Sequence, residues 1–154
     1  MTPGVFPPGP WDDEPDHEVW REATSNLLCA IVRHDDFGSL CGYVRIPKVC
    51  PLHGQARDVV GELVRVHGGI TFADEANTGA LPRGWWVGFD TGHGFDEQPG
   101  MIAFKEQFRR ERPDLHHDDD QPPAFRDKYR TWAYVRAEVE SLAQQLAALP
   151  KDAL

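Results

Sequence analysis

The sequence predicts an α+β domain in which a mostly antiparallel sheet of four or five strands is covered by a long C-terminal helix. Short apolar runs rich in β-branched and aromatic residues recur between turns that contain glycine and aspartate, a pattern typical of neighbouring antiparallel strands. Near the C-terminus, apolar residues recur at intervals of three and four, as on one face of a helix. Because four or more amphipathic strands need a cover, we expect this helix to pack on the sheet.

The N-terminal segment contains the first predicted elements. Residues 1–11 are rich in proline and glycine and are expected to form an extended arm. A single domain is expected over residues 12–150, followed by a short tail at 151–154. Within it, Asp12–Ala23 is predicted to be a short helix, with an aspartate as its cap and Pro15 in its first turn.

Four strands are predicted next. The apolar runs Leu27–Arg33 and Leu40–Ile46, joined by a turn with aspartate and glycine, indicate two of them, and Trp85–Phe89 indicates the last. Between them, Leu63–Phe72 is predicted to be a strand with a bulge or a close backbone approach, because two glycines interrupt it. Asp74–Arg83 is expected to be a loop.

Two helices are predicted in the C-terminal part. Met101–Arg110 is expected to form a short helix, and Arg126–Leu149 the long helix, which Pro150 ends. The apolar face of the long helix either packs on the sheet or forms the seam of a homodimer. Between the helices, Leu115–Asp120 contains two histidines and three aspartates, which would either ligate a transition metal or form a solvated loop.

Composition limits the function classes. The chain has 154 residues, enough for one domain, and a formal net charge of −9. Binding of duplex nucleic acid is disfavoured, because it depends on lysine and arginine displacing counterions, whereas a small anionic ligand needs only a few local cations. No apolar stretch reaches the length of about 18 residues expected of a membrane span, and the odd set of three cysteines favours a reduced, cytoplasmic protein.

Histidines and carboxylates beside glycines mark the candidate site. Such residues occur at the ends of two apolar runs, where the backbone must turn sharply or approach another group closely. We expect the two segments to meet at one rim of the sheet. The predicted rim consists of His67, Gly68, Gly69, Asp90, His93 and Asp96.

Two chemistries compete for this rim. In the first, the glycines admit a small anionic ligand or a host protein, the histidines donate hydrogen bonds, and Trp85 or Trp86 supplies a stacking surface. In the second, a divalent-metal hydrolase uses the same residues, with zinc or manganese bound by His67, Asp90 and His93. His93 and Asp96 are its catalytic candidates, with Asp96 as the base. A structural interpretation of Asp90 is that its carboxylate caps backbone amides within the turn.

Cysteine chemistry is a further candidate. Cys50 precedes His53 at a spacing that would suit a metal clip or an activated thiol. Cys29 and Cys41 lie within or at the start of predicted strands and are expected to be small core residues.

The chain resembles a group of uncharacterised proteins encoded by bacteriophages and prophages, over residues 27–146. The residues that carry the resemblance are Leu40–Val44, Val66–Phe72, Trp85–Asp90 with His93 and Asp96, Tyr129, and Tyr134–Val139. The group has no established activity to carry over. The resemblance implies an accessory protein in the cytoplasm of a bacterial host, which binds a host factor or sequesters a small signalling molecule, with a role in counter-defence or, alternatively, in the virion.

Overall fold

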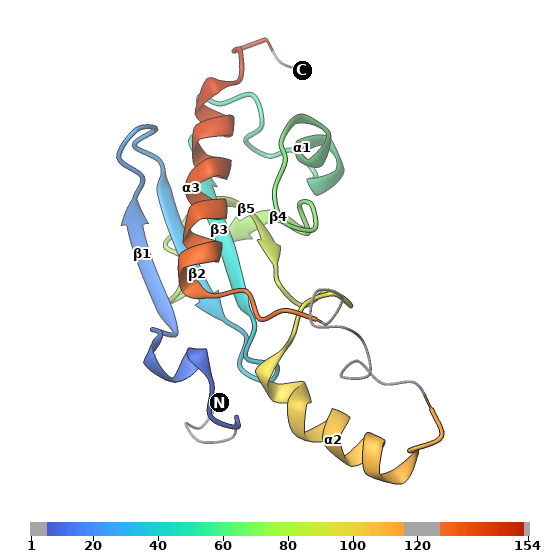
Figure 1. Ribbon diagram of the computed structural model, residues 1–154. Coiled ribbons are helices and arrows are strands. Elements are labelled where there is room, and N and C mark those ends of the chain that lie inside the picture. Colours follow the sequence, from blue (N-terminus) through green and yellow to red (C-terminus); the bar gives the residue numbers. More distant parts are fainter. Residues whose placement is uncertain (1–5, 116–126, 153–154) are drawn as a thin grey trace.

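The computed structural model describes residues 6–115 and 127–152 and contains a five-stranded antiparallel sheet (Figure 1). The order of the strands is β1-β2-β3-β5-β4, and every neighbouring pair is antiparallel. The strands are β1 (His17–Arg21), β2 (Leu28–Arg33), β3 (Leu40–Ile46), β4 (Phe72–Ala76) and β5 (Gly84–Asp90). The predicted α+β class is therefore confirmed, with five strands.

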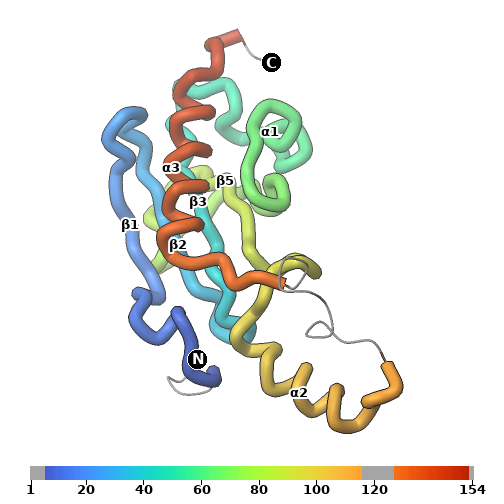
Figure 2. Tube along the Cα trace, viewed as in Figure 1, coloured from blue at the N-terminus to red at the C-terminus, as the bar shows by residue number. Residues whose placement is uncertain are grey.

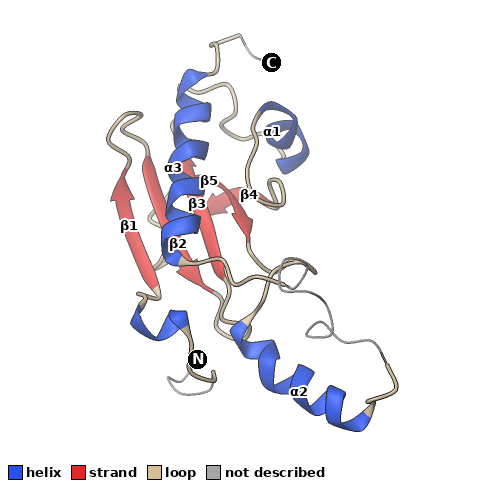
Figure 3. Ribbon diagram, in the orientation of Figure 1, coloured by secondary structure: helices blue, strands red, loops and turns tan. Residues whose placement is uncertain are grey.

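Helix α3 (Trp132–Ala148) lies across one face of the sheet and packs mainly on β3 and β2 (Figure 3). Its buried side chains are Val135, Val139, Leu142, Ala143 and Leu146. The predicted packing on the sheet is confirmed, and the side chains that a dimer seam would use are covered by the sheet. The predicted start at Arg126 is wrong and the helix is shorter, because Thr131 caps it by accepting a hydrogen bond from the amide of Tyr134.

The predicted helix over Asp12–Ala23 is wrong. This segment forms a 3₁₀ turn, η1 (Pro10–Asp13), followed by β1. In β1, Val19 pairs with Ala30 and Trp20 with Cys29, so successive side chains face opposite sides of the sheet. The few apolar residues of this short segment fit a strand as well as a helix, and pairing with β2 decides between them.

The predicted strand over Leu63–Phe72 is also wrong. Helix α1 (Arg57–Leu63) precedes a loop that includes Gly68 and Gly69, with φ angles of 66° and 84°. Two consecutive residues with positive φ cannot continue a strand. The strand, β4, begins instead at Phe72 and ends at Ala76, so it takes up only the start of the segment predicted as a loop, Asp74–Arg83.

The second face of the sheet is covered in part by the loop at 77–83. Leu81 of this loop packs on Trp86, which is fully buried and donates a hydrogen bond from its indole Nε1 to the carbonyl of Pro82 at 2.8 Å. Beyond β5, the 3₁₀ turn η2 (Pro99–Met101) leads into α2 (Ile102–Glu111), which projects from the body of the molecule (Figure 2). The short helix predicted at Met101–Arg110 is therefore confirmed. In the described part of the chain, no helix is long and apolar enough to cross a bilayer.

Glu22 stabilises the turn between β1 and β2. Its carboxylate is buried and accepts hydrogen bonds from the amides of Thr24 and Ser25 and from the side chain of Gln144 on α3. The hydrogen bonds from Ser25 are the main reason that the pKa of Glu22 is lowered to about 2.

Replacing Glu22 by glutamine is expected to destabilise the protein at neutral pH, because one amide oxygen cannot replace two ionised oxygens. Since the folded pKa lies below the ordinary value, the stabilisation by Glu22 is fully present above about pH 4.5 and is lost as the pH falls toward 2. Urea denaturation of both proteins across this range measures the difference. Glu62→Gln, on the exposed side of α1, is the control and should leave the pH dependence unchanged. A difference between Glu22→Gln and wild type that does not shrink in acid would contradict the assignment.

Candidate functional site

His67 and Asp96, which lie in separate segments, meet beside the sheet as the sequence predicts. The imidazole Nε2 of His67 lies 3.0 Å from both carboxylate oxygens of Asp96. His93 reaches the same carboxylate, with its Nδ1 2.9 Å from Oδ2 of Asp96. We call these three side chains the His67–Asp96–His93 network.

Asp96 is the centre of this network and is only 1% exposed. Besides the two imidazoles, its carboxylate accepts hydrogen bonds from Nε of Arg130 at 2.9 Å and from the backbone amide of His93 at 3.1 Å. Burial alone would raise the pKa of Asp96, but the hydrogen bonds from His67, Arg130 and His93 outweigh it and hold the pKa below its usual value. Asp96 is therefore an ionised acceptor with its lone pairs in use, which argues against the predicted role as a general base.

Helix α3 fixes the orientation of His67. The hydroxyl of Tyr134 lies 2.8 Å from Nδ1 of His67, and Glu138, one turn further along, accepts a hydrogen bond from the backbone amide of His67 at 2.9 Å. These two contacts direct Nε2 toward Asp96. Neither α3 residue was predicted to belong to the site, although their spacing of four places them on one face of a helix.

His93 packs between an aromatic ring and the backbone of the first segment. Its imidazole stacks on Phe95, with the ring centroids 5.0 Å apart and the planes inclined by 5°. On the other segment, a Cβ atom added to Gly68 would lie 2.2 Å from Cε1 of His93. Only glycine fits at this position, so the predicted close approach at Gly68 is made to the His93 ring.

Arg130 is delivered to the site by the segment that precedes α3. Lys128 forms an isolated β-bridge with Asp96, and the hydroxyl of Tyr129 accepts a hydrogen bond from buried Arg33 at 2.9 Å. The guanidinium of Arg130 also lies over the ring of Tyr134, 5.2 Å from its centroid. The network therefore joins the loop after α1 to the turn after β5, and its contacts extend to Arg130 and to the start of α3.

Asp90 lies beside the network rather than within it. The Asp90 side chain is 39% exposed. Its Oδ1 accepts a hydrogen bond from the backbone amide of Gly92 at 2.9 Å and lies 3.7 Å from Nδ1 of His93. This is the capping role that the structural interpretation assigns to Asp90. Asp90 also lines an apolar groove of about 580 Å³. The walls of this groove include Phe37, Tyr43 and Phe72.

The two tryptophans lie away from the predicted rim. Trp86 is fully buried beneath the loop at 77–83 and offers no stacking surface. Trp85 packs partly against the core on the α3 side of the sheet, 6.0 Å from the ring of His53 between centroids. A Cβ atom added to Gly69 would meet nothing within 4 Å, so no close approach is made at this glycine.

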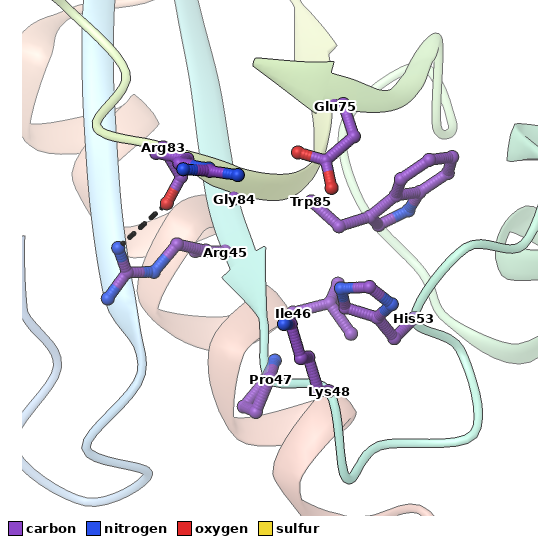
Figure 4. A pocket seen from close by; sticks show the side chains of 9 residues that line it. All are labelled: Arg45, Ile46, Pro47, Lys48, His53, Glu75, Arg83, Gly84 and Trp85. Atoms are coloured by element: carbon purple, nitrogen blue, oxygen red, sulfur yellow. Dashed lines mark hydrogen bonds between the residues drawn. The ribbon is translucent and has the colours of Figure 1, made fainter. Parts of the chain in front are cut away.

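Trp85 belongs instead to a basic hollow of about 320 Å³ at the opposite end of β5 (Figure 4). We call it the basic hollow; its polar lining residues are Arg45, Lys48, His53, Glu75, Arg83 and Trp85. The stem of Arg45 lies against Gly84, and its guanidinium donates a hydrogen bond to the carbonyl of Arg83 at 3.2 Å. Among the described residues, no carboxylate lies within ion-pair distance of Arg45, Lys48 or Arg83.

Cys29 is a buried thiol, as the sequence predicts, and Cys41 is a partly buried one. Burial raises the pKa of Cys29 to about 12 and that of Cys41 to about 11, so both remain thiols near neutral pH. Cys50 is partly buried against the core, and its carbonyl accepts a hydrogen bond from the amide of His53.

The residues with metal-ligating chemistry converge at the network. The ligand atoms of His67, His93 and Asp96 all lie within 4.8 Å of one another, and no other such group of three occurs in the described residues. Asp96 thus takes the place that the predicted ligand set gave to Asp90. The other predicted metal candidate, the histidines and aspartates at 116–120, lies outside the described residues.

Comparisons of the chain with protein-family models, with curated proteins and with solved structures return no match. The function must therefore be inferred from the geometry of these sites.

Proposed function

We propose that this protein binds a small anionic ligand in the basic hollow. The observation that carries the proposal is that three cations, Arg45, Lys48 and Arg83, line one hollow and have no ion-pair partner in the described part of the chain. In a protein with a net charge of −9, such a cluster is a local exception to the averaged field.

The shape of the hollow supports an organic anion rather than a bare ion. Its volume of about 320 Å³ is near the lower end of small-molecule sites, and an indole and an imidazole form part of its wall. The indole Nε1 of Trp85 is buried and has no hydrogen-bond partner among the described residues. Glu75, the one carboxylate of the lining, adds an acceptor for the polar part of a ligand.

The apolar groove is the weaker choice for an anion. It is the larger of the two, but its lining includes Asp90 and no lysine or arginine. The anionic ligand predicted for the rim is therefore better placed in the basic hollow, where Arg83 and Trp85 supply the charge and the aromatic ring.

Replacing Arg83 by glutamine is expected to weaken binding of AMP at least tenfold. Loss of one charge-assisted hydrogen bond costs about 1.5–3 kcal/mol, and about 1.4 kcal/mol corresponds to a factor of ten. Titrations followed by tryptophan fluorescence should show the highest affinity for AMP, a lower affinity for inorganic phosphate and the lowest for adenosine, because only AMP combines a phosphate with a ring.

Arg110→Gln is the matched control, because it removes one positive charge from α2, which follows the other end of β5. Its affinity for AMP should equal that of wild type. The same affinity in both variants, or binding of neither AMP nor phosphate by wild type, would contradict the proposal.

We extend the proposal to a biological role through the predicted resemblance to phage-encoded proteins. Within this proposal, the protein acts in the cytoplasm of a bacterial host and sequesters a small anionic molecule that the host uses in defence. Docking on a host protein and incorporation into virions stay predictions from the sequence.

A further inference from the structure

We propose that His67, His93 and Asp96 form a zinc-binding centre, with Nε2, Nδ1 and Oδ2 as the respective ligand atoms. This inference is independent of the basic hollow and depends on the geometry of the His67–Asp96–His93 network. It changes the ligand set expected from the sequence, because Asp96 rather than Asp90 supplies the carboxylate.

The distances between donor atoms fit one small cation. Oδ2 of Asp96 lies 3.0 Å from Nε2 of His67 and 2.9 Å from Nδ1 of His93, and all three ligand atoms lie within 4.8 Å of one another. Zinc with bonds of about 2.0–2.1 Å to nitrogen and oxygen requires separations of roughly 3.3 Å between tetrahedral ligands. Oδ2 is thus within a few tenths of an ångström of the required separation from each nitrogen. The two nitrogens lie within 4.8 Å of each other, and a shift of the partly exposed His93 ring would bring them to the tetrahedral separation.

The outer contacts favour this arrangement. Arg130 donates to Oδ1 of Asp96, which leaves Oδ2 as the oxygen that faces both imidazoles. Tyr134 holds Nδ1 of His67, which directs Nε2 inward. Ligands of metal ions are commonly oriented by such hydrogen bonds on the atom that does not coordinate.

The donor set and the burial point to zinc with an open position. Two imidazoles and one carboxylate are typical zinc ligands, and three protein ligands leave a fourth tetrahedral position. His67 and Asp96 are buried, whereas the His93 side chain is 22% exposed, so the open position would lie on the His93 side of the centre.

Zinc binding to the full chain tests the proposal directly. The protein is dialysed against EDTA, loaded with zinc chloride, desalted and analysed for metal, and a parallel sample is loaded with Co²⁺ for visible spectroscopy. We expect one zinc per chain and a tetrahedral Co²⁺ spectrum. Retention of much less than one zinc, with no such spectrum, would show that the network is a hydrogen-bonded cluster and would overturn the proposal.

Variants locate the bound ion. His93→Ala is expected to lower zinc affinity about a hundredfold or more, and Tyr134→Phe, which changes only an outer contact, by about tenfold to a hundredfold. His17→Gln is the matched control, because His17 is an exposed imidazole on β1 outside the network, and it should bind zinc as wild type does. Equal affinity in wild type, His93→Ala and Tyr134→Phe would place the metal elsewhere. If His93→Ala does not fold, Tyr134→Phe and the Co²⁺ spectrum still decide the question.

Discussion

Replacing Asp96 by asparagine is expected to destabilise the protein by about 3 kcal/mol in metal-free buffer. Removing one member of a buried ion pair lowers the free energy of unfolding by about 3–5 kcal/mol, because the remaining charge loses its partner. The lower end applies here, since the Arg130 side chain is 22% exposed and can be hydrated in part. The asparagine amide would also present a donor to groups that now donate to Asp96. Urea denaturation at pH 7 in EDTA measures the change in the free energy of unfolding.

Asp90→Asn is the matched control for this experiment. Asp90 is the same residue type near the same histidine, but its side chain is 39% exposed and lies 3.7 Å from Nδ1 of His93. Exposed ion pairs contribute about 0–1 kcal/mol, so this variant should remain within about 1 kcal/mol of wild type. Equal effects of the two substitutions would show that the buried network does not stabilise the fold as its geometry implies.

Replacing Gly68 by alanine is expected to have an effect of similar size, about 2–4 kcal/mol. Two costs add: the residue has a φ of 66°, which disfavours a side chain, and its Cβ would lie 2.2 Å from the His93 ring. The imidazole would have to leave Asp96 or the loop would have to move. Chemical denaturation gives the loss of stability, and histidine NMR signals report whether the His93 ring has moved.

Gly69→Ala separates these two costs. Gly69 has a φ of 84°, but a Cβ there would meet nothing within 4 Å. This variant should therefore lose only about 1 kcal/mol, the cost of the backbone conformation, and should leave the His93 signals in place. If Gly68→Ala proved no more harmful than Gly69→Ala, the contact between the Gly68 backbone and His93 would not be tight.

The central strands could be predicted closely from the sequence, whereas the edge strands could not. β2, β3 and β5 are buried on both faces or nearly so, and their continuous apolar runs mark them. β4 is an edge strand with exposed Asp74 and Glu75, so its composition resembles that of a loop. β1 is short and has few apolar residues, which leaves its period ambiguous until it pairs with β2.

The centre of the network could be predicted, but its surroundings could not. His67 and His93 stand beside glycines that follow apolar runs, and Asp96 follows three residues after His93, which marks them locally. Arg130 and Tyr134 carry no local signal, because their roles depend on where α3 crosses the sheet. In the same way, alternation in β5 shows that Trp85 and Trp86 face opposite sides of the sheet, but not that a loop covers Trp86.

The distance along the chain between members of the network has a consequence for biosynthesis. His67 and Tyr134 are separated by 67 positions, and Asp96 and Arg130 by 34. While the ribosome is still making α3, the central aspartate has no guanidinium beside it and His67 has no hydroxyl to orient it. The emerging polypeptide therefore completes the surroundings of this centre last. A premature stop codon ahead of α3 would keep the three side chains of the network but remove Tyr134 and Glu138, which orient His67.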